Sequence, residues 1–307
     1  MSPVRRGMKK DASLIAQRVA DQLSRDALIE PLVSDQFSRQ EFELAISNST
    51  NPWWVDDASG RIRGHLYGTT LEDSLFGRQT WTGPDGYSYE VLDVLDNLCE
   101  QAYRSWRQEG SNAHLVWALA GSGTQDWLER GYRMMSVRAA RALEAVEEFT
   151  WPHDYRLRRG TLTDLATALE FDGLIDRAQG VDPETLTAEQ RSANRADLEN
   201  LLDDPECYYY LVDIDGSPAA QCVTFPLPAL RGNFANTLHI GSLAVSPAFR
   251  RQGLATMMMR EIMNSAFGEG FAYAEVRWHI DNRLATPFWP TLGFRPTYVQ
   301  LRRTLKD

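Results

Sequence analysis

The chain has 307 residues, of which 43% are hydrophobic, and this length suits two globular domains better than one. Its formal net charge of -10 argues against a general nucleic-acid binder, because such proteins need a basic surface to neutralise phosphates. Any anion site in this acidic chain is therefore expected to be local.

The sequence contains no pattern typical of export or membrane insertion. Residues 1–17 carry positive charges without an apolar core, and no apolar run approaches the roughly 18 residues of a membrane helix. We therefore expect a cytoplasmic protein without membrane partners. The cysteines, Cys99, Cys207 and Cys222, have no C-x-x-C spacing, so we expect buried thiols and neither disulfides nor a metal site.

The first half of the sequence mixes strand and helix patterns. Residues 52–68 indicate two strands joined by a turn at residues 57–60, and residues 89–97 indicate a further strand. A helix is expected over residues 98–108 and a strand over residues 114–120. The first half is therefore predicted to be a mixed α+β domain.

A segment at the end of the first half recurs at the end of the second. Residues 124–143 align with residues 286–305 without a gap, and both contain the pattern W-x-x-x-G-aromatic-R. This repeat predicts a duplicated domain. Pro152 interrupts any preceding helix, so we place the boundary there, with domains at 1–150 and 151–307.

The second half shows clear helix, hairpin and strand patterns. Residues 162–178 and 187–202 indicate helices, and residues 208–225 indicate a hairpin that turns at Asp215 and Gly216. Residues 237–246 indicate a strand ended by Pro247, and the apolar stripe after Gly253 indicates a helix with its methionines in the core. Residues 271–279 alternate as a strand does.

The turn between this strand and helix has the features of an anion site. A helix that begins at Gly253 presents unpaired amides and the positive end of its dipole. Arg250 and Arg251 add donors at the same place, and Gly253 lets a phosphate approach the backbone. Two positive charges at a helix start oppose the helix dipole unless an anion binds. The segment therefore predicts a pyrophosphate site.

These residues resemble the acyl-CoA pyrophosphate loop of the GNAT family of N-acetyltransferases. Residues 250–255 match the family signature Q/R-x-x-G-x-G/A, and residues 282–294 resemble the later pattern N-x-x-A-x-x-x-Y-x-x-x-G-F. The resemblance covers residues 155–307, whereas the first half lacks the glycine loop and resembles a degenerate GNAT domain. It implies an α+β fold of two tandem GNAT domains, each a mixed, mostly antiparallel sheet flanked by helices. This layout is similar to that of the mycothiol synthases.

The resemblance assigns cofactor-binding roles to individual residues. It implies acetyl-CoA as co-substrate and no metal. Backbone groups of Leu243, Ala244 and Val245 would bind the pantetheine arm, and the Leu243 amide would polarise the thioester carbonyl. Asn282 would lie near this arm. The pyrophosphate would be held by Arg250, Arg251, Gln252, Gly253, Leu254, Ala255 and Thr256.

The general base is left open between three candidates. His239 stands where many family members carry a glutamate, and an imidazole can take a proton from an amine. Strand alternation places His239 on the same face as Leu243 and Val245 unless a bulge intervenes. Glu275 and a water molecule are the alternatives.

The proton donor is also open, because Trp289 stands at the family's tyrosine position. An indole N–H is not a useful acid. Tyr298 or Tyr273 would replace it, or the thiolate would leave without a dedicated acid.

The implied function is transfer of an acetyl group from acetyl-CoA to the primary amine of a small molecule in a ternary complex. The protein would be a monomer or homodimer. Two alternatives stay open: a non-catalytic acyl-CoA-binding or regulatory module, and an enzyme for another acyl-CoA reaction. Residues 171–207 hold ten acidic residues against three arginines, a balance that attracts a cationic amine or only promotes solubility.

Overall fold

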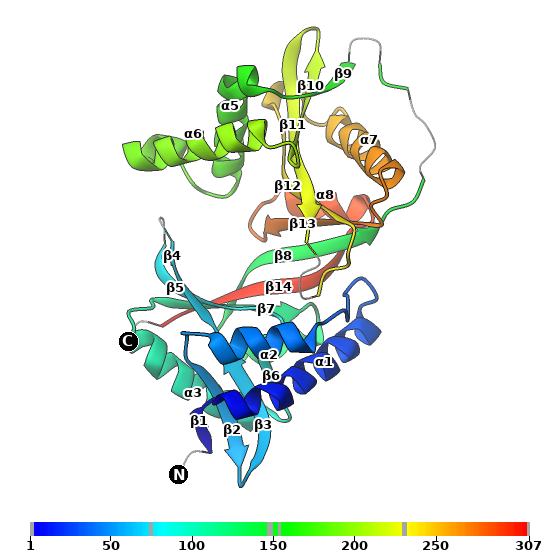
Figure 1. Ribbon diagram of the computed structural model, residues 1–307. Helices are drawn as coiled ribbons and strands as arrows, with labels where there is room; N and C mark the ends of the chain where they lie inside the picture. Colours follow the sequence, from blue (N-terminus) through cyan, green and yellow to red (C-terminus); the bar gives the residue numbers. More distant parts are fainter. Residues whose placement is uncertain (1–2, 74–75, 146–149, 153–154, 229–231, 306–307) are drawn as a thin grey trace. The chain divides into compact units, whose positions relative to one another are not determined.

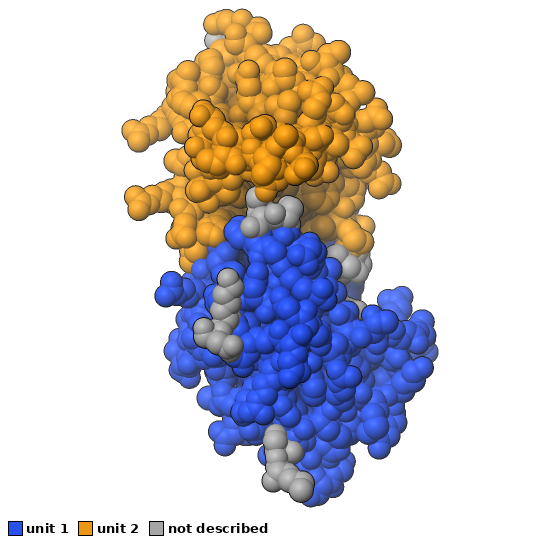
Figure 2. All heavy atoms as spheres, turned by 90° about the vertical axis from the view of Figure 1, so that its left-hand side faces the viewer, with its two compact units in different colours: residues 1–137, 231–234, 296–307 blue, residues 138–230, 235–295 orange. Residues whose placement is uncertain are grey.

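The computed structural model describes residues 3–73, 76–145, 150–152, 155–228 and 232–305, and the chain forms two compact units (Figure 2). Unit 1 comprises residues 1–137, 231–234 and 296–307, and unit 2 comprises residues 138–230 and 235–295. Strand β8, Arg133–Ala142, begins in unit 1 and ends in unit 2.

Unit 1 contains a small antiparallel sheet with the strand order β1-β2-β3-β6. Its strands are β1 Val4–Arg6, β2 Trp53–Ala58, β3 Arg61–Tyr67 and β6 Tyr87–Tyr89. After a short turn at Lys9–Asp11, helices α1, Ala12–Ile29, and α2, Arg39–Asn48, lie side by side (Figure 1). The apolar stripe of α1 (Ile15, Val19, Leu23) packs with Val55 and Ile62 of the sheet. This packing builds the first core of unit 1.

Helix α3 spans Leu92–Gln108, so the strand predicted over residues 89–97 is wrong beyond Tyr89. Its buried residues recur at helical spacing: Val94, Leu95, Leu98, Cys99 and Ala102. They pack in one cluster with residues of β3 and β7. Burial of this stripe favours helix, since a strand would have turned alternate residues to solvent.

The remaining strands of unit 1 have the order β4-β5-β7-β14, with β8 next to β14. They are β4 Thr69–Asp73, β5 Gly77–Thr82, β7 Ala113–Leu119 and β14 Arg295–Thr304. β14 runs antiparallel to β7, with Tyr298 opposite Leu119. The last strand of the sequence therefore completes the sheet of unit 1.

The repeated sequence segment forms the same local structure at both of its positions. Helices α4, Ser122–Leu128, and α8, Ala285–Thr291, are each followed by a glycine and then by β8 or β14. The φ angles of the two glycines, Gly131 and Gly293, are 78° and 79°. Such positive angles favour glycine because other residues lose energy there. The sequence repeat is thus a structural repeat.

Unit 2 contains a mixed sheet with the order β13-β12-β11-β10-β9. Its strands are β9 Tyr155–Arg159, β10 Tyr208–Ile214, β11 Ser217–Leu227, β12 Thr237–Val245 and β13 Tyr273–His279. β12 and β13 are parallel, whereas the other pairs are antiparallel. The predicted hairpin turns at Asp215 and Gly216, whose φ angles are 50° and 75°.

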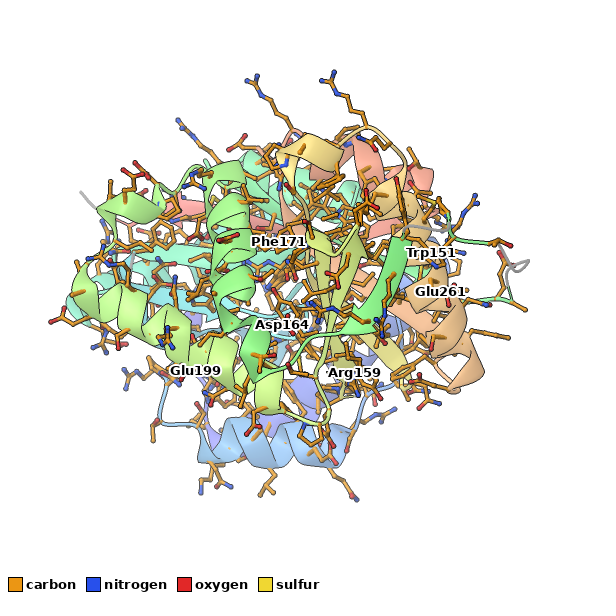
Figure 3. The ribbon with its side chains drawn as sticks, turned by 90° about the horizontal axis from the view of Figure 1, so that it is seen from above. Trp151, Arg159, Asp164, Phe171, Glu199 and Glu261 are labelled. Carbon is orange, nitrogen blue, oxygen red and sulfur yellow. The ribbon has the colours of Figure 1, made fainter. Side chains whose placement is uncertain are left out.

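Helices cover both faces of this sheet (Figure 1). On one face lie α5, Leu165–Ala178, and α6, Ala188–Asp203, which pack against each other and carry Phe171 and Glu199 (Figure 3). Short turns at Leu162–Asp164 and Pro183–Thr185 precede these helices. On the other face, after a turn at Pro247–Phe249, lies α7, Leu254–Gly268. Its buried methionines, Met258, Met259 and Met263, confirm their predicted place in the core. The α+β fold with helix-flanked sheets is therefore confirmed.

The three cysteines are free and buried, and no described helix is suited to a bilayer. Cys222 on β11 lies under α7, with its Sγ 3.9 Å from the Sδ of Met259. This contact fits the packing role expected of the thiols. Among the described residues, no helix combines the length and apolar character needed to cross a membrane.

Candidate active site

Strands β12 and β13 separate part-way along their length. They pair in parallel from Thr237 opposite Tyr273 to Ile240 opposite Val276. β12 continues to Val245, and in the described chain no pairing with β13 follows Ile240. Backbone groups of residues 241–245 on this side are therefore open to a ligand that carries amides of its own.

A cavity of about 480 Å³ lies at this separation and is called the donor cavity below. It is lined by α5 (Leu174, Ile175, Ala178), the end of β12 (243–245), the loop and first turn of α7 (249–251, 253–256) and the α8 region (Asn282, Leu284, Ala285, Phe288, Trp289). One end is basic because Arg250 and Arg251 lie there, whereas α5 and α8 supply apolar walls.

The loop before α7 provides amides and room for an anion. Gly253 has φ 79° and directly precedes the helix. Met257 donates to the Gly253 carbonyl at 3.0 Å, so the amides of Leu254, Ala255 and Thr256 precede the first such helical bond. A Cβ added at Gly253 would meet nothing within 4 Å. The backbone is therefore approachable at the positive end of the helix dipole.

The two arginines of this loop are held in different ways. Arg250 Nε donates to the Val245 carbonyl at 3.0 Å, which ties the loop to the end of β12. Arg251 has φ 64°, a left-handed conformation that costs energy for a residue with a Cβ. Such strain is often found at ligand sites, where the surrounding structure maintains it.

A second cavity, of about 350 Å³, lies between the sheet and helices α5 and α6 and is called the acceptor cavity below. It is lined by Ala168, Asp172, Ile175, Leu198, Leu201, Tyr209, Gln221, Val223, Phe225, His239, Gly241 and Ser242. Ile175 lines both cavities, and Ser242 of one is the chain neighbour of Leu243 of the other. The two cavities thus meet at residues 241–243 of β12.

Gly241 is an extra residue in β12 and decides which side chains face which cavity. Val223 of β11 pairs with Ser242, whereas the next residue, Thr224, pairs with Ile240, so Gly241 forms a β-bulge. Side chains of paired residues share a face, which places His239 with Ser242. The expectation that His239 faces the same side as Leu243 and Val245 is therefore wrong, because the bulge reverses the alternation.

His239 lies between the acceptor cavity and a buried carboxylate. Its Nδ1 is 3.4 Å from Oε1 of Glu275, whose Oε2 is 3.6 Å from Nε of Arg138. The ring of Phe225 lies against the imidazole with the centroids 4.9 Å apart. The carboxylate favours a proton on Nδ1, which leaves Nε2 as the proton acceptor.

Comparison with known proteins finds a family match that lies mostly in unit 2. The model of the Acetyltransferase (GNAT) family matches residues 176–294, which include β12, the loop before α7 and α8. Residues 176–294 thus match the GNAT acetyltransferase family in sequence. A comparison with curated protein sequences finds no match.

The chain as a whole is similar in fold to solved GNAT proteins. A GCN5-related N-acetyltransferase from Sphaerobacter thermophilus has a TM-score of 0.64 at 16% identity, covering 99% of this chain and 96% of that one. A tandem GNAT protein from the clavulanic acid biosynthesis pathway has a TM-score of 0.58 at 13% identity, covering 99% and 98%. A glucosamine N-acetyltransferase region of a fungal β-N-acetylglucosaminidase has a TM-score of 0.56 at 12% identity, covering 97% and 37%. The shared property is the tandem GNAT fold.

Most of the cofactor residues predicted for the GNAT domain line the donor cavity. They are Leu243, Ala244, Val245, Arg250, Arg251, Gly253, Leu254, Ala255, Thr256 and Asn282. Gln252 is not among the lining residues, and its Nε2 donates to the Ala248 carbonyl at 3.3 Å. The Oδ1 of Asn282 accepts from the amides of Leu284 and Ala285, both at 3.0 Å, so this side chain also shapes the start of α8.

The structure does not bring the predicted tyrosine acids to the GNAT site. Tyr298 lies in unit 1, is 1% exposed and packs with Val33 and Leu119. Neither Tyr298 nor Tyr273 lines the donor or acceptor cavity. The strand that carries Tyr298 completes the sheet of unit 1, which the sequence spacing does not reveal. We therefore leave both tyrosines out of the proposed chemistry.

Trp289, at the family's tyrosine position, is a packing residue that also lines the donor cavity. It is 4% exposed and makes edge contacts with Phe288 and Phe294 at centroid distances of 5.1 and 5.3 Å. Its counterpart in the repeat, Trp127, is fully buried and contacts Tyr87 at 5.1 Å. Both tryptophans thus close the core beside the repeated glycine.

Asp172 is a candidate binding residue that the sequence analysis did not single out. It lines the acceptor cavity from α5, on the face that also carries Ala168 and Ile175. Burial first, and then the charges of Asp176 and Asp197, raise the pKa of Asp172 to about 6. The only signal in the sequence is an acidic residue at a core-facing position of a helix within the acidic stretch 171–207.

Proposed function

We propose that the GNAT domain transfers an acetyl group from acetyl-CoA to the primary amine of a small molecule in a ternary complex. The observation that carries this proposal is the meeting of two cavities at residues 241–243, one with an anion cradle and one with a histidine. Two substrates bound in these cavities have their reacting groups at the junction, so proximity alone lowers the barrier. The protein would act in the cytoplasm as a monomer or homodimer.

The donor cavity supplies the contacts that acetyl-CoA requires. The amides of residues 254–256, with Arg250 and Arg251, would hold the pyrophosphate, and the open edge of β12 would pair with the pantetheine amides. The Leu243 amide would donate to the thioester carbonyl and stabilise the negative charge that develops on its oxygen. This cradle supports CoA as the acyl carrier.

His239 is the proposed general base. Its Nε2 would take a proton from the attacking amine, directly or through water, while the new N–C bond forms and the C–S bond breaks. Glu275 would stabilise the resulting imidazolium through Nδ1, and it lines neither cavity itself. The thiolate would take a proton from solvent, since a thiol pKa of about 8.5 makes it an adequate leaving group without a dedicated acid.

The acyl-CoA site is proposed for unit 2 alone, with residues 1–150 as the degenerate domain. Helix α3 of unit 1 begins at Leu92, and the sequence from residue 87 to residue 109 contains no glycine. Tyr87 and Trp127 fill the space beside that helix start with an aromatic contact at 5.1 Å. An approachable phosphate loop therefore has no counterpart there.

A non-catalytic acyl-CoA-binding module is the second candidate, and Trp289 at the tyrosine position is the observation that favours it. The full chain would be mixed with acetyl-CoA and a panel of primary amines, and free thiol and product mass would be measured. Amine-dependent thiol release with a matching acetylated product supports the transferase. CoA binding without thiol release supports the binding module, and thiol release without an acetylated amine supports another acyl-CoA reaction.

A further inference from the structure

The floor of the acceptor cavity runs across three strands. Ser242 on β12 pairs with Val223 on β11, and Val223 pairs with Tyr209 on β10. Paired residues share a face, and neighbouring strands lie about 4.8 Å apart, so Tyr209 is roughly 10 Å from Ser242. Because Ser242 adjoins the donor cavity, Tyr209 marks the end of the acceptor cavity farthest from the acetyl group.

Two polar groups without partners lie at this far end. The Tyr209 side chain is buried, with 2% of the residue exposed, and its hydroxyl has no hydrogen-bond partner within the described part of the chain. The Asp172 carboxylate likewise has neither a hydrogen bond nor an ion pair with a described residue. Both residues line the acceptor cavity, and the pKa of Tyr209 is raised by burial first and then by the charge of Asp172. The Asp172 side chain is half-buried, so both groups have hydrogen-bonding capacity that a ligand in the cavity can use.

The charge around this end has one sign. Asp176, one turn along α5, and Asp197 on α6 both raise the pKa of Asp172, and no cation contributes to that shift. No described residue forms an ion pair with Asp172, and an ammonium ligand has the charge and the donors to pair with this carboxylate.

The walls between the two ends of the acceptor cavity are apolar. Ala168, Leu198, Leu201 and Val223 line the cavity, and the amide of Gln221, which also lines it, donates from Nε2 to Oγ of Ser242 at 3.1 Å. Apolar walls favour an alkyl chain over a sugar or peptide, whose hydroxyl or amide groups would stay unpaired there. The cavity thus presents a nucleophile end, an apolar middle and an anionic end.

We infer that the acceptor is a compact aliphatic diamine, with one amine at the junction beside Ser242 and the other held as an ammonium by Asp172 and Tyr209. This inference rests on the proposed transferase function. It adds a substrate class and two specificity-determining residues.

Three amines of equal chain length test the inference: putrescine, butylamine and γ-aminobutyrate. Each offers the same primary amine, whereas the far end is an ammonium, a methyl group or a carboxylate. The kcat/KM should fall in that order, with putrescine about tenfold or more above butylamine, mainly through KM, because only the diamine pairs with the Asp172 carboxylate. Equal use of the three amines overturns the inference and leaves the transferase proposal standing.

Substitutions of Asp172 and Tyr209 test whether these two residues cause the preference for putrescine over butylamine. Asp172→Asn should bring the ratio of putrescine to butylamine close to one, and Tyr209→Phe should lower it in part. The matched control is Glu170→Gln, at an exposed position of the same helix outside the cavity lining, which should keep the preference. Calorimetric CoA affinity shows whether each variant is folded. A ratio that Asp172→Asn leaves unchanged overturns the inference.

A binding measurement separates this inference from the proposed function. Putrescine would be titrated into the CoA-bound protein and into its Asp172→Asn variant. Binding that the substitution weakens, together with absent acetylation, supports the cation site and contradicts the transferase. The opposite result, acetylation of amines without any Asp172-dependent binding of putrescine, contradicts only the cation site.

Discussion

His239 and Glu275 face each other across the parallel pair of β12 and β13, with Nδ1 of the imidazole 3.4 Å from Oε1 of the carboxylate. Only 8% of the Glu275 side chain is exposed, and Arg138 lies 3.6 Å from its other oxygen. The carboxylate therefore lies close enough to favour a proton on Nδ1, which would leave Nε2 as the proton acceptor on the side of the acceptor cavity.

Substitution of either residue should change turnover more than CoA binding. His239→Ala should lower kcat by about a hundredfold, the usual contribution of a general base, and remove the acidic limb of the pH–rate profile. Glu275→Gln should lower kcat less, because Glu275 lines neither cavity and acts on the reaction only through His239. Profiles of kcat/KM against pH and calorimetric CoA affinity check both results. Unaltered profiles would make His239 a packing residue.

We expect Gly253 to be required for CoA binding for a reason other than its positive φ angle. Gly253→Ala should cost about 1–2 kcal/mol of stability because φ is 79°. Gly253→Glu should in addition abolish CoA binding, because a negative charge would occupy the anion cradle.

Gly270 provides the matched control for this prediction. It lies beyond the other end of α7 with φ 96° and open space at its Cβ. Gly270→Glu should lose similar stability in thermal unfolding yet keep its CoA affinity. Equal CoA binding by the two glutamate variants would remove the cradle assignment.

Asp172→Asn should stabilise the protein at high pH. Burial raises the pKa of Asp172 to about 6, above the value of about 3.9 expected in the unfolded chain. The folded state therefore binds this proton more tightly, and the associated stability is present below pH 4 and lost as pH rises through 6. At pH 8 the variant should be about 1–2 kcal/mol more stable than the wild type, because it lacks the buried charge.

Denaturant unfolding at pH 4 and pH 8 measures this difference. The advantage of the variant should disappear at pH 4, where the native carboxyl is protonated. A pH-independent effect would mean that Asp172 is stabilised by contacts rather than destabilised by burial of its charge.

Two buried histidines should make unit 1 sensitive to acid. Burial lowers the pKa of His65 to about 4 and that of His114 to about 3, against an ordinary value of about 6.5. Both rings are hydrogen-bonded, His65 to Ser88 at 2.8 Å and His114 to Thr82 at 2.8 Å. The unfolded chain takes up these protons first, so stability is present above pH 6.5 and is lost as pH falls towards 3.

The slope of stability against pH measures the contribution of each histidine. Each should add about 1.4 kcal/mol per pH unit between pH 6 and its folded pKa. His65→Asn keeps a group near Ser88 but cannot take up a proton, so it should remove one such contribution. A variant with the wild-type slope would contradict the neutral, buried state of His65.

Features that depend on neighbouring residues in the chain were predictable from the sequence. The hairpin at Asp215 and Gly216, the buried methionines of α7 and the cradle at residues 250–256 all lie within a few residues of their causes. Turn preferences, helical periodicity and the exposed amides of a helix start act over that range. The repeat of residues 124–143 also identified a structural unit, because identical residues serve the same local packing.

Contacts between distant segments decided the rest. The bulge at Gly241 exists only through pairing with β11, and it determines which face carries His239. Glu275 reaches His239 through the β12–β13 register, and Asp172 and Tyr209 line one cavity because α5 packs over β11 and β12 while α6 packs over β10. Helix α3 forms where a strand was predicted, because its apolar residues are buried in a core with residues from distant strands. The sequence by itself determined the donor loop, since its geometry is local. Only the tertiary structure decided the acceptor cavity, because strand register and helix packing bring its residues together from distant parts of the chain.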